Sequence, residues 1–478
     1  MPLILGTNSI KDTGYDVANS LRFNSGSSDY LTRTSGTPTS NQKGTLSFWL
    51  KRSILGNKRI YSNYVGTDDY VFIDFRSDDK LRINVDDEGI LNISTNRVFR
   101  DTSAWYHIVF AVDTTQGTAS NRCKIYVNGV LETSFLTATY PNQNVGLNMF
   151  NASVSNGSVI GAFYNGSGYF EFQDGYFSEF CLIDGQQLDP TSFGEFDSDT
   201  NIWKPIDVSG LTFGNSGFYL DFEDSSALGN DKAGSNNFTV NNLTAIDQST
   251  DTCTNNFATW NPLVGSNAGG STYYSPTLAN GNLKATPGNN AQNPIAVSTI
   301  GVSSGKWYAE FVLVSETDSG NASMIGVTDN LSAFQTENTQ SSSQIIYGDN
   351  GTVYNSRAGD PTDTGTTFST GNIIGVALDL DNNYIYFSVN GTFISSGNPT
   401  SGASGTGGFA LGSGTNEYFF MVGDSRDGNT SVFQGNFGGT QTFAISSGNT
   451  DGNGYGNFEY SVPANYYSLC SKNLAEYG

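Results

Sequence analysis

Histidine and cysteine, on which many catalytic and metal sites depend, are scarce in this sequence. Its 478 residues include one histidine, His107, and four cysteines, with no CxxC pair and no cysteine beside the histidine. Zinc sites of the His-rich type are therefore excluded. A catalytic histidine also needs a nucleophile and an orienting partner, and the residues around His107 indicate neither. We expect His107 to be structural.

The cysteines are too far apart to indicate a disulfide framework. We expect buried free thiols, because a cytosolic chain of this length does not need a disulfide for stability. A bridge between Cys123 and Cys181 is the alternative. The four positions are Cys123, Cys181, Cys253 and Cys470.

Long apolar runs and positive charge are also scarce. No apolar run approaches the roughly 20 residues that span a bilayer, and the start, MPLILGTNSIKD, lacks the features of a secretory signal. With 45 acidic and 22 basic residues, the formal charge of −23 repels phosphate backbones and anionic membrane surfaces. We expect no nucleic-acid binding and no membrane insertion, and a protein that stays in the cytosol or leaves it by lysis.

The residues that are abundant are typical of β-structure. Glycine (56 residues), with much serine, threonine and asparagine, suits a chain with many tight turns. Aromatic residues make up 13% of the chain, enough to fill cores although only 37% of it is hydrophobic. Apolar and polar residues alternate through Thr45–Lys51, Val71–Phe75 and Lys80–Asp86. This period of two predicts strands with one face on a core and the other in water.

Asn-Gly pairs, the preferred centre of type I′ hairpin turns, separate many of these segments. Short strands joined by such turns predict an all-β protein of antiparallel β-sandwich or jelly-roll type. We expect helical turns only near Pro190–Phe193 and Leu331–Phe334. The Asn-Gly pairs begin at Asn128, Asn156, Asn165, Asn350 and Asn390.

The length of the chain and a weak internal sequence repeat predict two sandwich domains in tandem. A single core stops growing at about 250 to 300 residues, and the pattern of Trp105–Gly129 returns in Asn372–Gly391 as an apolar strand, an acidic turn and a strand ending in Val-Asn-Gly. A stretch rich in Asn, Ser, Thr, Asp and Gly lies between the halves. We therefore predict an N-terminal arm over 1–19, sandwiches over 20–222 and 271–474, and a connecting segment over 223–270.

One predicted strand, Tyr384–Asn390, gives a specific expectation about the core. Ile385, Phe387 and Val389 share one face of it. We expect these three side chains to be buried, and substitutions at Tyr386 or Ser388 to matter less.

Several motifs resemble known domain families. The first half resembles laminin-G-like, concanavalin A-like domains through SLRFNSGSSDYLTRT, GTLSFWLKR, AWYHIVFAVD with KIYVNG, and DGYFSEFCLIDGQQL. The second half resembles SPRY domains through GKWYAEFVLV, MIGVTD, YGDNGTVYN and IIGVALDLDNNYIYFSVNG. Their tandem order, with FYLDFEDSSALGNDKAG and YYSLCSKNL, is similar to virion proteins of tailed phages of cyanobacteria and other marine bacteria.

The resemblance implies recognition without catalysis, because rim loops of both domain types bind glycans or peptides. It implies a tail-fibre-like or spike-like virion protein, assembled in the host cytoplasm and released by lysis, that binds a host-surface glycan or protein. The arm 1–19 would dock to other virion proteins. We expect a homo-oligomer, and a trimer is the favoured oligomeric state. The alternatives are a capsid-decoration protein, a polysaccharide depolymerase and a plain peptide-binding module.

Loops that combine aromatic faces with hydrogen-bond donors predict the ligand site in the second half. One such loop surrounds the Asn350-Gly351 turn, and another follows a strand at Asp424. The predicted ligand-binding residues are Tyr347, Asp349, Asn350, Tyr354, Arg357, Asp424 and Arg426.

Acidic pairs at strand ends offer two further possibilities. Calcium prefers several carboxylate and carbonyl oxygens. A calcium site is therefore one interpretation of these acidic pairs, and ordinary solvated turns are the other and favoured one. A retaining glycosidase needs two carboxylates about 5 to 5.5 Å apart, and the acidic strings found here read as turns instead. The calcium candidates are Asp68, Asp69, Asp86 and Asp87, with Asp379 and Asp381; the nearest carboxylate strings are Asp86–Glu88, Glu195–Asp197 and Asp379–Asp381. We otherwise expect no cofactor.

Overall fold

The fold of the chain is seen in a computed structural model. The structure describes residues 10–67, 69–85, 89–147, 149, 157–264, 275–287, 295–317, 323–329, 331, 344–355, 361–411, 417–424 and 430–478. They form two compact units that are nearly all β: a first unit, Thr13–Thr254, and a second unit of Asn255–Gly478 with Met1–Asp12. The predicted fold class, all-β with antiparallel sandwiches, is confirmed.

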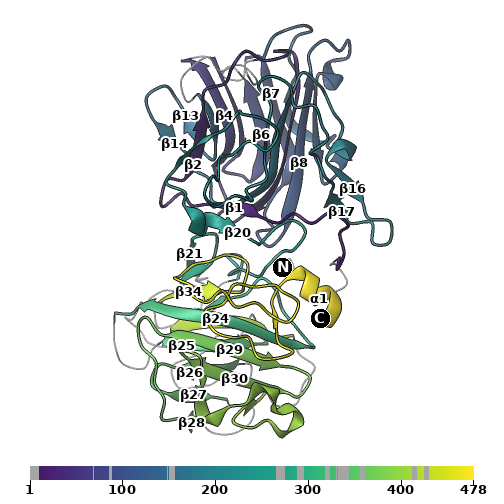
Figure 1. Ribbon diagram of the computed structural model, residues 1–478. Coiled ribbons are helices and arrows are strands. Elements are labelled where there is room, and N and C mark those ends of the chain that lie inside the picture. Colours follow the sequence, from purple (N-terminus) through teal and green to yellow (C-terminus); the bar gives the residue numbers. More distant parts are fainter. Residues whose placement is uncertain are drawn as a thin grey trace. The chain divides into compact units, whose positions relative to one another are not determined.

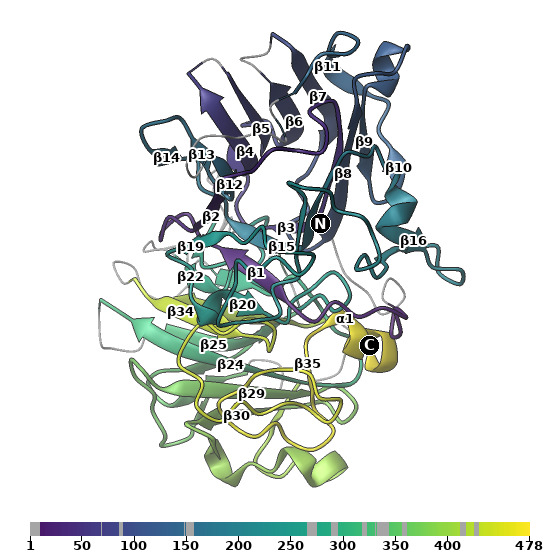
Figure 2. The same ribbon diagram turned by 45° about the horizontal axis from the view of Figure 1, so that its top comes forward.

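The first unit contains two large antiparallel sheets, which face each other as layers (Figures 1 and 2). Sheet A has the order β10 (Val130–Leu131), β9 (Cys123–Val127), β8 (Trp105–Asp113), β3 (Lys43–Arg52), β15 (Gly175–Asp184), β1 (Ser20–Phe23), β20 (Gln248–Ser249), and β18 (Phe218–Leu220) also pairs with β15. Sheet B has the order β11 (Phe135–Thr139), β7 (Leu91–Val98), β6 (Lys80–Val85), β5 (Asp69–Phe75), β4 (Lys58–Gly66), β12 (Ser158–Ile160), β2 (Tyr30–Arg33), β19 (Thr239–Asn241).

Two small hairpins lie outside these sheets. They pair β13 (Phe163–Tyr164) with β14 (Tyr169–Phe170), and β16 (Gly194–Phe196) with β17 (Trp203–Pro205).

The core of the first unit lies between sheets A and B. Leu46, Phe48 and Leu50 of β3 and Leu81, Ile83 and Val85 of β6 are all buried in it, as the alternating pattern predicts. The opposite face of β3 is not in water, however. Trp49 is 3% exposed and Lys51 1% exposed, because residues that follow β15, such as Phe193, Val208 and Trp203, pack on this face of sheet A.

The second unit repeats the two-sheet arrangement with shorter strands. Sheet C has the order β21 (Thr277–Ala279), β22 (Lys284–Thr286), β34 (Val432–Asn436), β24 (Lys306–Ser315), β29 (Ile373–Asp379), β30 (Tyr384–Val389), β31 (Thr392–Phe393). β32 (Phe409–Ala410) also pairs with β30, and β35 (Tyr467–Ser468) pairs with β24 in the parallel sense. Sheet D has the order β23 (Ile295–Val297), β33 (Phe419–Asp424), β25 (Ser323–Thr328), β26 (Gln344–Gly348), β27 (Thr352–Tyr354), β28 (Thr362–Asp363).

Helical structure is short throughout the described residues. The turn predicted near Pro190–Phe193 is the 3-10 helix η3 (Pro190–Ser192), whereas residues 332–334 of the other predicted turn lie outside the described residues. The α-helix α1 (Ser471–Tyr477), yellow in Figure 1, was not predicted. Nor were η2 (Ala119–Asn121), η4 (Ala245–Asp247), η5 (Ile394–Ser396) and η6 (Pro399–Ser404). A helix with the length and apolar character of a membrane span does not occur in the described part of the chain.

The predicted turn type is confirmed at two hairpins. Asn128 and Gly129 have φ angles of 48° and 76°, and Asn390 and Gly391 have 49° and 79°. Positive φ at both central residues is the requirement of a type I′ turn. At Asn165-Gly166 and Asn350-Gly351 only the glycine has a positive φ, 88° and 84°, so the prediction of type I′ turns is wrong there. Asn156 lies outside the described residues.

The thiols are all free in the structure. Cys123, Cys181 and Cys470 are buried as predicted, and Cys253 is half-buried.

The boundary between the two units lies at Thr254–Asn255, inside the stretch 223–270 that we predicted as a connecting segment. Residues before it supply β19 and β20 to the first unit, whereas Phe257 and Trp260 form bridges to Cys470 and Ser298 of the second. The described part of the predicted arm is also packed. Val17 is 5% exposed and its backbone N–H donates to Thr254 Oγ1 over 3.1 Å.

Strand β30 tests the expectation about the second core. Ile385 and Phe387 are buried as predicted, whereas Val389 is only half-buried against the same cluster. The expectation for the opposite face is wrong, because Tyr386 and Ser388 are each 1% exposed. Tyr386 packs there with Tyr308, Phe458 and Tyr466, so residues that follow β34 cover this face.

We therefore expect both faces of β30 to contribute to stability. Phe387→Ala should lower the free energy of unfolding by about 3 to 5 kcal/mol, and Tyr386→Ala by a similar amount, because each leaves a cavity in a packed cluster. Thr392→Ala on the neighbouring exposed position of β31 is the control. Urea denaturation measures the effect, and a Tyr386→Ala protein as stable as this control would contradict the packing of the second face.

Candidate functional site

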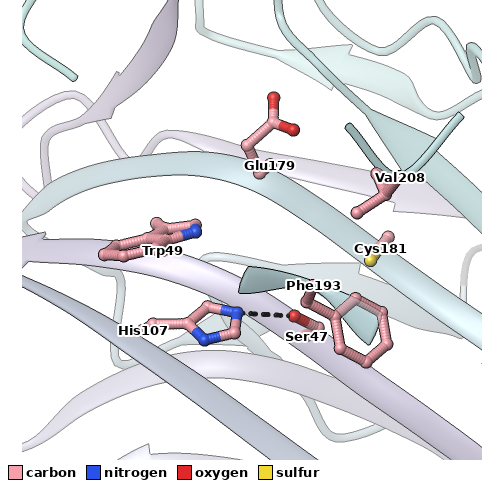
Figure 3. Close-up of a pocket in the computed structure, with 7 residues that line it drawn as sticks. All are labelled: Ser47, Trp49, His107, Glu179, Cys181, Phe193 and Val208. Carbon is pink, nitrogen blue, oxygen red and sulfur yellow. Dashed lines mark hydrogen bonds between the residues drawn. The ribbon is translucent and has the colours of Figure 1, made fainter. Parts of the chain in front are cut away.

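The only histidine lies in a closed polar cluster on sheet A (Figure 3). His107 of β8 is 1% exposed. Its Nδ1 accepts a hydrogen bond from Trp203 Nε1 over 3.0 Å, and its Nε2 lies 2.9 Å from Ser47 Oγ. Because Nδ1 accepts, the ring proton is on Nε2, which donates to the serine hydroxyl. Figure 3 shows Trp49 beside the imidazole, with ring centroids 4.8 Å apart.

This arrangement does not resemble a catalytic triad. A triad needs a carboxylate at the nitrogen that Trp203 occupies. Burial lowers the pKa of His107 to about 3, so the imidazole stays neutral. The space between Ser47, His107 and their neighbours does not admit a water molecule. The hydrogen bonds of His107 are those of a structural residue.

Glu179 lines the same cluster but points away from His107 in Figure 3. It lies where the pairing of β15 with β3 shifts register, with a φ of 49°. Its Oε2 accepts hydrogen bonds from Tyr219 Oη over 2.7 Å and Tyr15 Oη over 3.3 Å. Burial raises the pKa of Glu179 to about 7 despite these donors.

The residues predicted to bind ligand in the second unit are not all exposed. Tyr347 of β26 is fully buried, and its Oη donates to the Thr366 carbonyl over 2.6 Å. Its ring packs at 5.1 Å from Phe368 and 5.4 Å from Phe387. The expectation of an exposed aromatic at Tyr347 is therefore wrong, because its side chain faces the core between sheets C and D.

The remaining predicted residues fall into three groups. Asn350 and Tyr354 are half-buried neighbours, with Asn350 Nδ2 donating to Tyr354 Oη over 2.8 Å. Asp349 is buried, and Asp424 is buried at the end of β33, where it accepts hydrogen bonds from the Ser431 N–H and Oγ over 3.1 and 3.0 Å. Arg357 and Arg426 lie outside the described residues.

The structure also places those acidic calcium and carboxylate candidates that lie within the described residues. Asp68, Asp86 and Asp87 lie outside the described residues, and Asp69 is half-buried on β5. Asp379 pairs with Lys306 Nζ over 2.9 Å, and Glu195 and Asp197 share Lys204. Within the described ranges, no group of three or more His, Cys, Asp and Glu side chains is placed to hold a metal ion.

A surface that the sequence did not indicate lies on the outer side of sheet B. Half-buried and exposed aromatic side chains gather there around the β13–β14 hairpin, which packs on β4 and lies beside it in Figures 1 and 2. We call this surface the aromatic patch; it consists of Tyr30, Tyr64, Tyr70, Phe163, Tyr164, Tyr169, Phe170 and Phe172.

The turn of the hairpin holds the patch against the sheet. Asn165 Oδ1 accepts hydrogen bonds from the N–H groups of Ser167 and Gly168, each over 3.0 Å. Gly166 has a φ of 88°, and a Cβ at this position would lie 2.4 Å from Tyr64 Oη. The turn therefore requires glycine both for its backbone conformation and for its contact with β4.

The rings of the patch form a continuous contact chain. Tyr30 and Tyr169 lie 4.2 Å apart between centroids, Tyr169 and Tyr164 4.8 Å, and Tyr164 and Tyr64 5.3 Å. Phe170 at the hairpin is 48% exposed. Burial among the other tyrosines raises the pKa of Tyr169 to about 12, so its hydroxyl stays protonated and able to donate.

Charged groups at the border of the patch are already paired. The Arg59 guanidinium lies 3.9 Å from the Phe72 ring centroid and pairs with Asp74 over 3.1 Å and with Glu171. Arg82 pairs with the same Asp74 over 2.8 Å. The patch therefore presents flat apolar faces and neutral hydroxyls, with paired charges beside them.

Two family models match separate parts of the chain. Residues 25–180, which include the aromatic patch, match the concanavalin A-like lectin/glucanases superfamily, and residues 306–411 match the SPRY domain. The chain is thus similar to a concanavalin A-like domain in its first half and to a SPRY domain in its second half. The two matches support the predicted domain content and its order along the chain.

Solved structures give more distant likenesses. The SPRY domain of human HERC1 is 17% identical, covers 39% of this chain and 99% of its own, with a TM-score of 0.29. A Bacteroides ovatus protein named as a candidate carbohydrate-binding protein is 18% identical, with coverages of 48% and 59% and a TM-score of 0.35. Domains LG4-5 of the mouse laminin alpha1 chain are 10% identical, with coverages of 96% and 89% and a TM-score of 0.28. No curated protein sequence matches the chain.

The buried Glu179 predicts how stability depends on pH. Between its ordinary pKa of 4.5 and about 7, the folded state binds more protons than the unfolded state. The free energy of unfolding therefore falls as pH rises through this window, and Glu179 adds no slope above it. Glu179→Gln should become steadily more stable relative to the wild type across the window, because the amide has no charge to bury.

Urea denaturation of both proteins at several pH values measures this difference. His107 contributes a slope of the opposite sign in both proteins, so its effect cancels in the difference. A difference that does not change with pH would contradict the raised pKa of Glu179.

Proposed function

We propose that the chain is a non-catalytic adhesion protein whose concanavalin A-like unit binds glycans through the aromatic patch. The observation that carries this proposal is the chain of tyrosine rings from Tyr30 through Tyr169 to Tyr64. Aromatic faces pack on the apolar faces of sugar rings, and tyrosine hydroxyls donate hydrogen bonds to sugar oxygens. Rings fixed by their neighbours lose little conformational entropy on binding.

Binding without hydrolysis is the favoured mode. The carboxylates beside the patch, Asp74 and Glu171, both pair with Arg59. His107 is neutral and engaged by Trp203. A depolymerase remains the competing proposal, because the matched superfamily includes glucanases as well as lectins.

The biological setting is proposed from the resemblance of the tandem motifs to tailed-phage virion proteins. In this proposal the protein is a tail-fibre-like or spike-like subunit that attaches the particle to a host-surface glycan or protein. It would assemble as a homo-oligomer in the host cytoplasm, dock through its N-terminal arm and leave by lysis. Capsid decoration is the alternative setting.

The SPRY domain offers a second contact surface. Tyr354, half-buried beside Asn350, is the described member of the predicted ligand loop that best combines exposure with a hydroxyl group. We propose it as an auxiliary contact, secondary to the aromatic patch.

Two phenylalanines of matched exposure provide the test. Phe170 in the patch is 48% exposed, and Phe196 on the β16–β17 hairpin is 45% exposed. Phe170→Ala and Tyr169→Ala should each weaken adhesion of the purified protein to susceptible cells about tenfold or more, equal to ~1.4 kcal/mol. Phe196→Ala should leave adhesion unchanged.

Incubation with the host polysaccharide completes the experiment. We expect no new reducing ends, and their appearance would establish the depolymerase instead. Adhesion of the Phe170→Ala and Tyr169→Ala proteins at the wild-type level would reject the patch as the binding site.

A further inference from the structure

The turn of the β13–β14 hairpin contains a pair of residues, Asn165-Gly166, that can react with each other. In an Asn-Gly pair the backbone nitrogen of glycine can attack the side-chain carbonyl carbon of asparagine, because glycine has no Cβ to hinder the approach. The attack is intramolecular and needs no catalyst. Further pairs begin at Asn128, Asn156, Asn280, Asn350, Asn390 and Asn453, of which Asn156 lies outside the described residues.

Two of the other pairs are fixed to a neighbouring strand. The N–H of Asn128 donates to the His107 carbonyl over 2.9 Å, and its Oδ1 accepts from the His107 N–H over 2.7 Å. Asn390 makes the same two hydrogen bonds to Ile373, over 2.8 and 2.9 Å. Ring closure at either pair would disrupt these bonds to β8 or β29, so the fold opposes it.

At the remaining described pairs the attacking glycine is engaged or enclosed. The Gly351 N–H donates to the Gly348 carbonyl over 3.0 Å. The Gly454 N–H donates to the Asp451 carbonyl over 3.0 Å. Gly281 is buried. An attack by any of these glycines first requires a hydrogen bond to break or packing to open.

Asn165-Gly166 differs in each of these respects. Both residues are exposed. The Gly166 N–H donates to no acceptor among the described residues, and neither does the Asn165 amide nitrogen, which is the leaving group. Asn165 Oδ1 accepts from the N–H groups of Ser167 and Gly168, each over 3.0 Å. Donors at this distance stabilise the negative charge that develops on a carbonyl oxygen under attack, as in an oxyanion hole.

We propose that Asn165 is a site of spontaneous deamidation that inactivates the aromatic patch over time. The Gly166 nitrogen loses its proton to solvent and forms a bond with Asn165 Cγ, and the side-chain amide leaves as ammonia. The product is a five-membered succinimide ring. Water then opens the ring at either carbonyl and leaves aspartate or isoaspartate at this position. The net reaction consumes one water, releases one ammonia and needs no oxidant or cofactor.

Either product alters the turn that holds the patch. Both carry a new negative charge, and isoaspartate also adds one carbon to the backbone. Gly166 lies against Tyr64, since a Cβ there would lie 2.4 Å from Tyr64 Oη. A shift of the turn therefore changes the ring contacts of Tyr164 with Tyr64 and Tyr169, at 5.3 and 4.8 Å. The resulting loss of glycan adhesion rests on the proposed function of the patch, whereas the deamidation itself does not.

Peptide mapping by mass spectrometry tests the chemistry on the full chain, incubated in mildly alkaline buffer. We expect the product at Asn165 to accumulate at least about tenfold faster than at any other described Asn-Gly pair. A proteolytic digest incubated in the same buffer is the control, and there the difference should disappear because the folded environment is lost. Equally fast deamidation at Asn128 or Asn390 in the folded protein would overturn the proposal. A preference for Asn165 that persists in the digest would also overturn it.

Adhesion of the same incubated samples to susceptible cells tests the consequence. Wild-type adhesion should fall in step with the modification of Asn165. The Asn165→Ser protein, which keeps an oxygen acceptor in the turn but has no side-chain amide, should retain its own starting adhesion throughout. Constant wild-type adhesion while the product accumulates would overturn the inactivation of the patch. Absence of adhesion before incubation would contradict the proposed function alone, and the peptide map would still decide the deamidation.

Discussion

The hydrogen bond from the Trp203 indole to His107 is the interaction on which much of the first unit depends. It fixes the tautomer of the imidazole and, through Nε2, the position of the Ser47 hydroxyl. It also joins the β16–β17 hairpin to sheet A. A Cβ at Gly129 would lie 2.3 Å from the Trp203 ring, and one at Gly194 would lie 2.6 Å from it. The indole is thus enclosed by two hairpins as well as by the histidine.

This enclosure explains why the polar residues of sheet A are not a reaction centre. Ser47, His107 and Glu179 are types that could catalyse hydrolysis, but each is engaged by a neighbouring side chain. A buried polar group without such a partner would cost free energy, so the cluster is satisfied internally. In the proposed function, recognition belongs to surfaces that keep part of their side chains in contact with solvent. The aromatic patch, with its half-buried and exposed rings, is such a surface.

The positions of functional side chains were predicted less well than the strands. The ligand loop predicted for the second unit rested on a local pattern, yet Tyr347 faces the core, and among the described residues of the prediction only Asn350 and Tyr354 are half-buried. The aromatic patch was missed because its residues come from separate segments between Tyr30 and Phe172. The aromatic residues on both sides of the Asn165-Gly166 turn were the one local signal that could have indicated it.

The sequence by itself determined the fold class, the inner face of the main strands and the turns at Asn128-Gly129 and Asn390-Gly391. Alternation specifies which side chains share a face, as for Leu46, Phe48 and Leu50, and these two Asn-Gly pairs join neighbouring strands directly, so both features are local properties of the backbone. Only the tertiary structure decided what covers the outer faces. Trp49 and Tyr386 are buried by segments distant in the sequence, and no periodicity within a strand can indicate a covering that another part of the chain supplies.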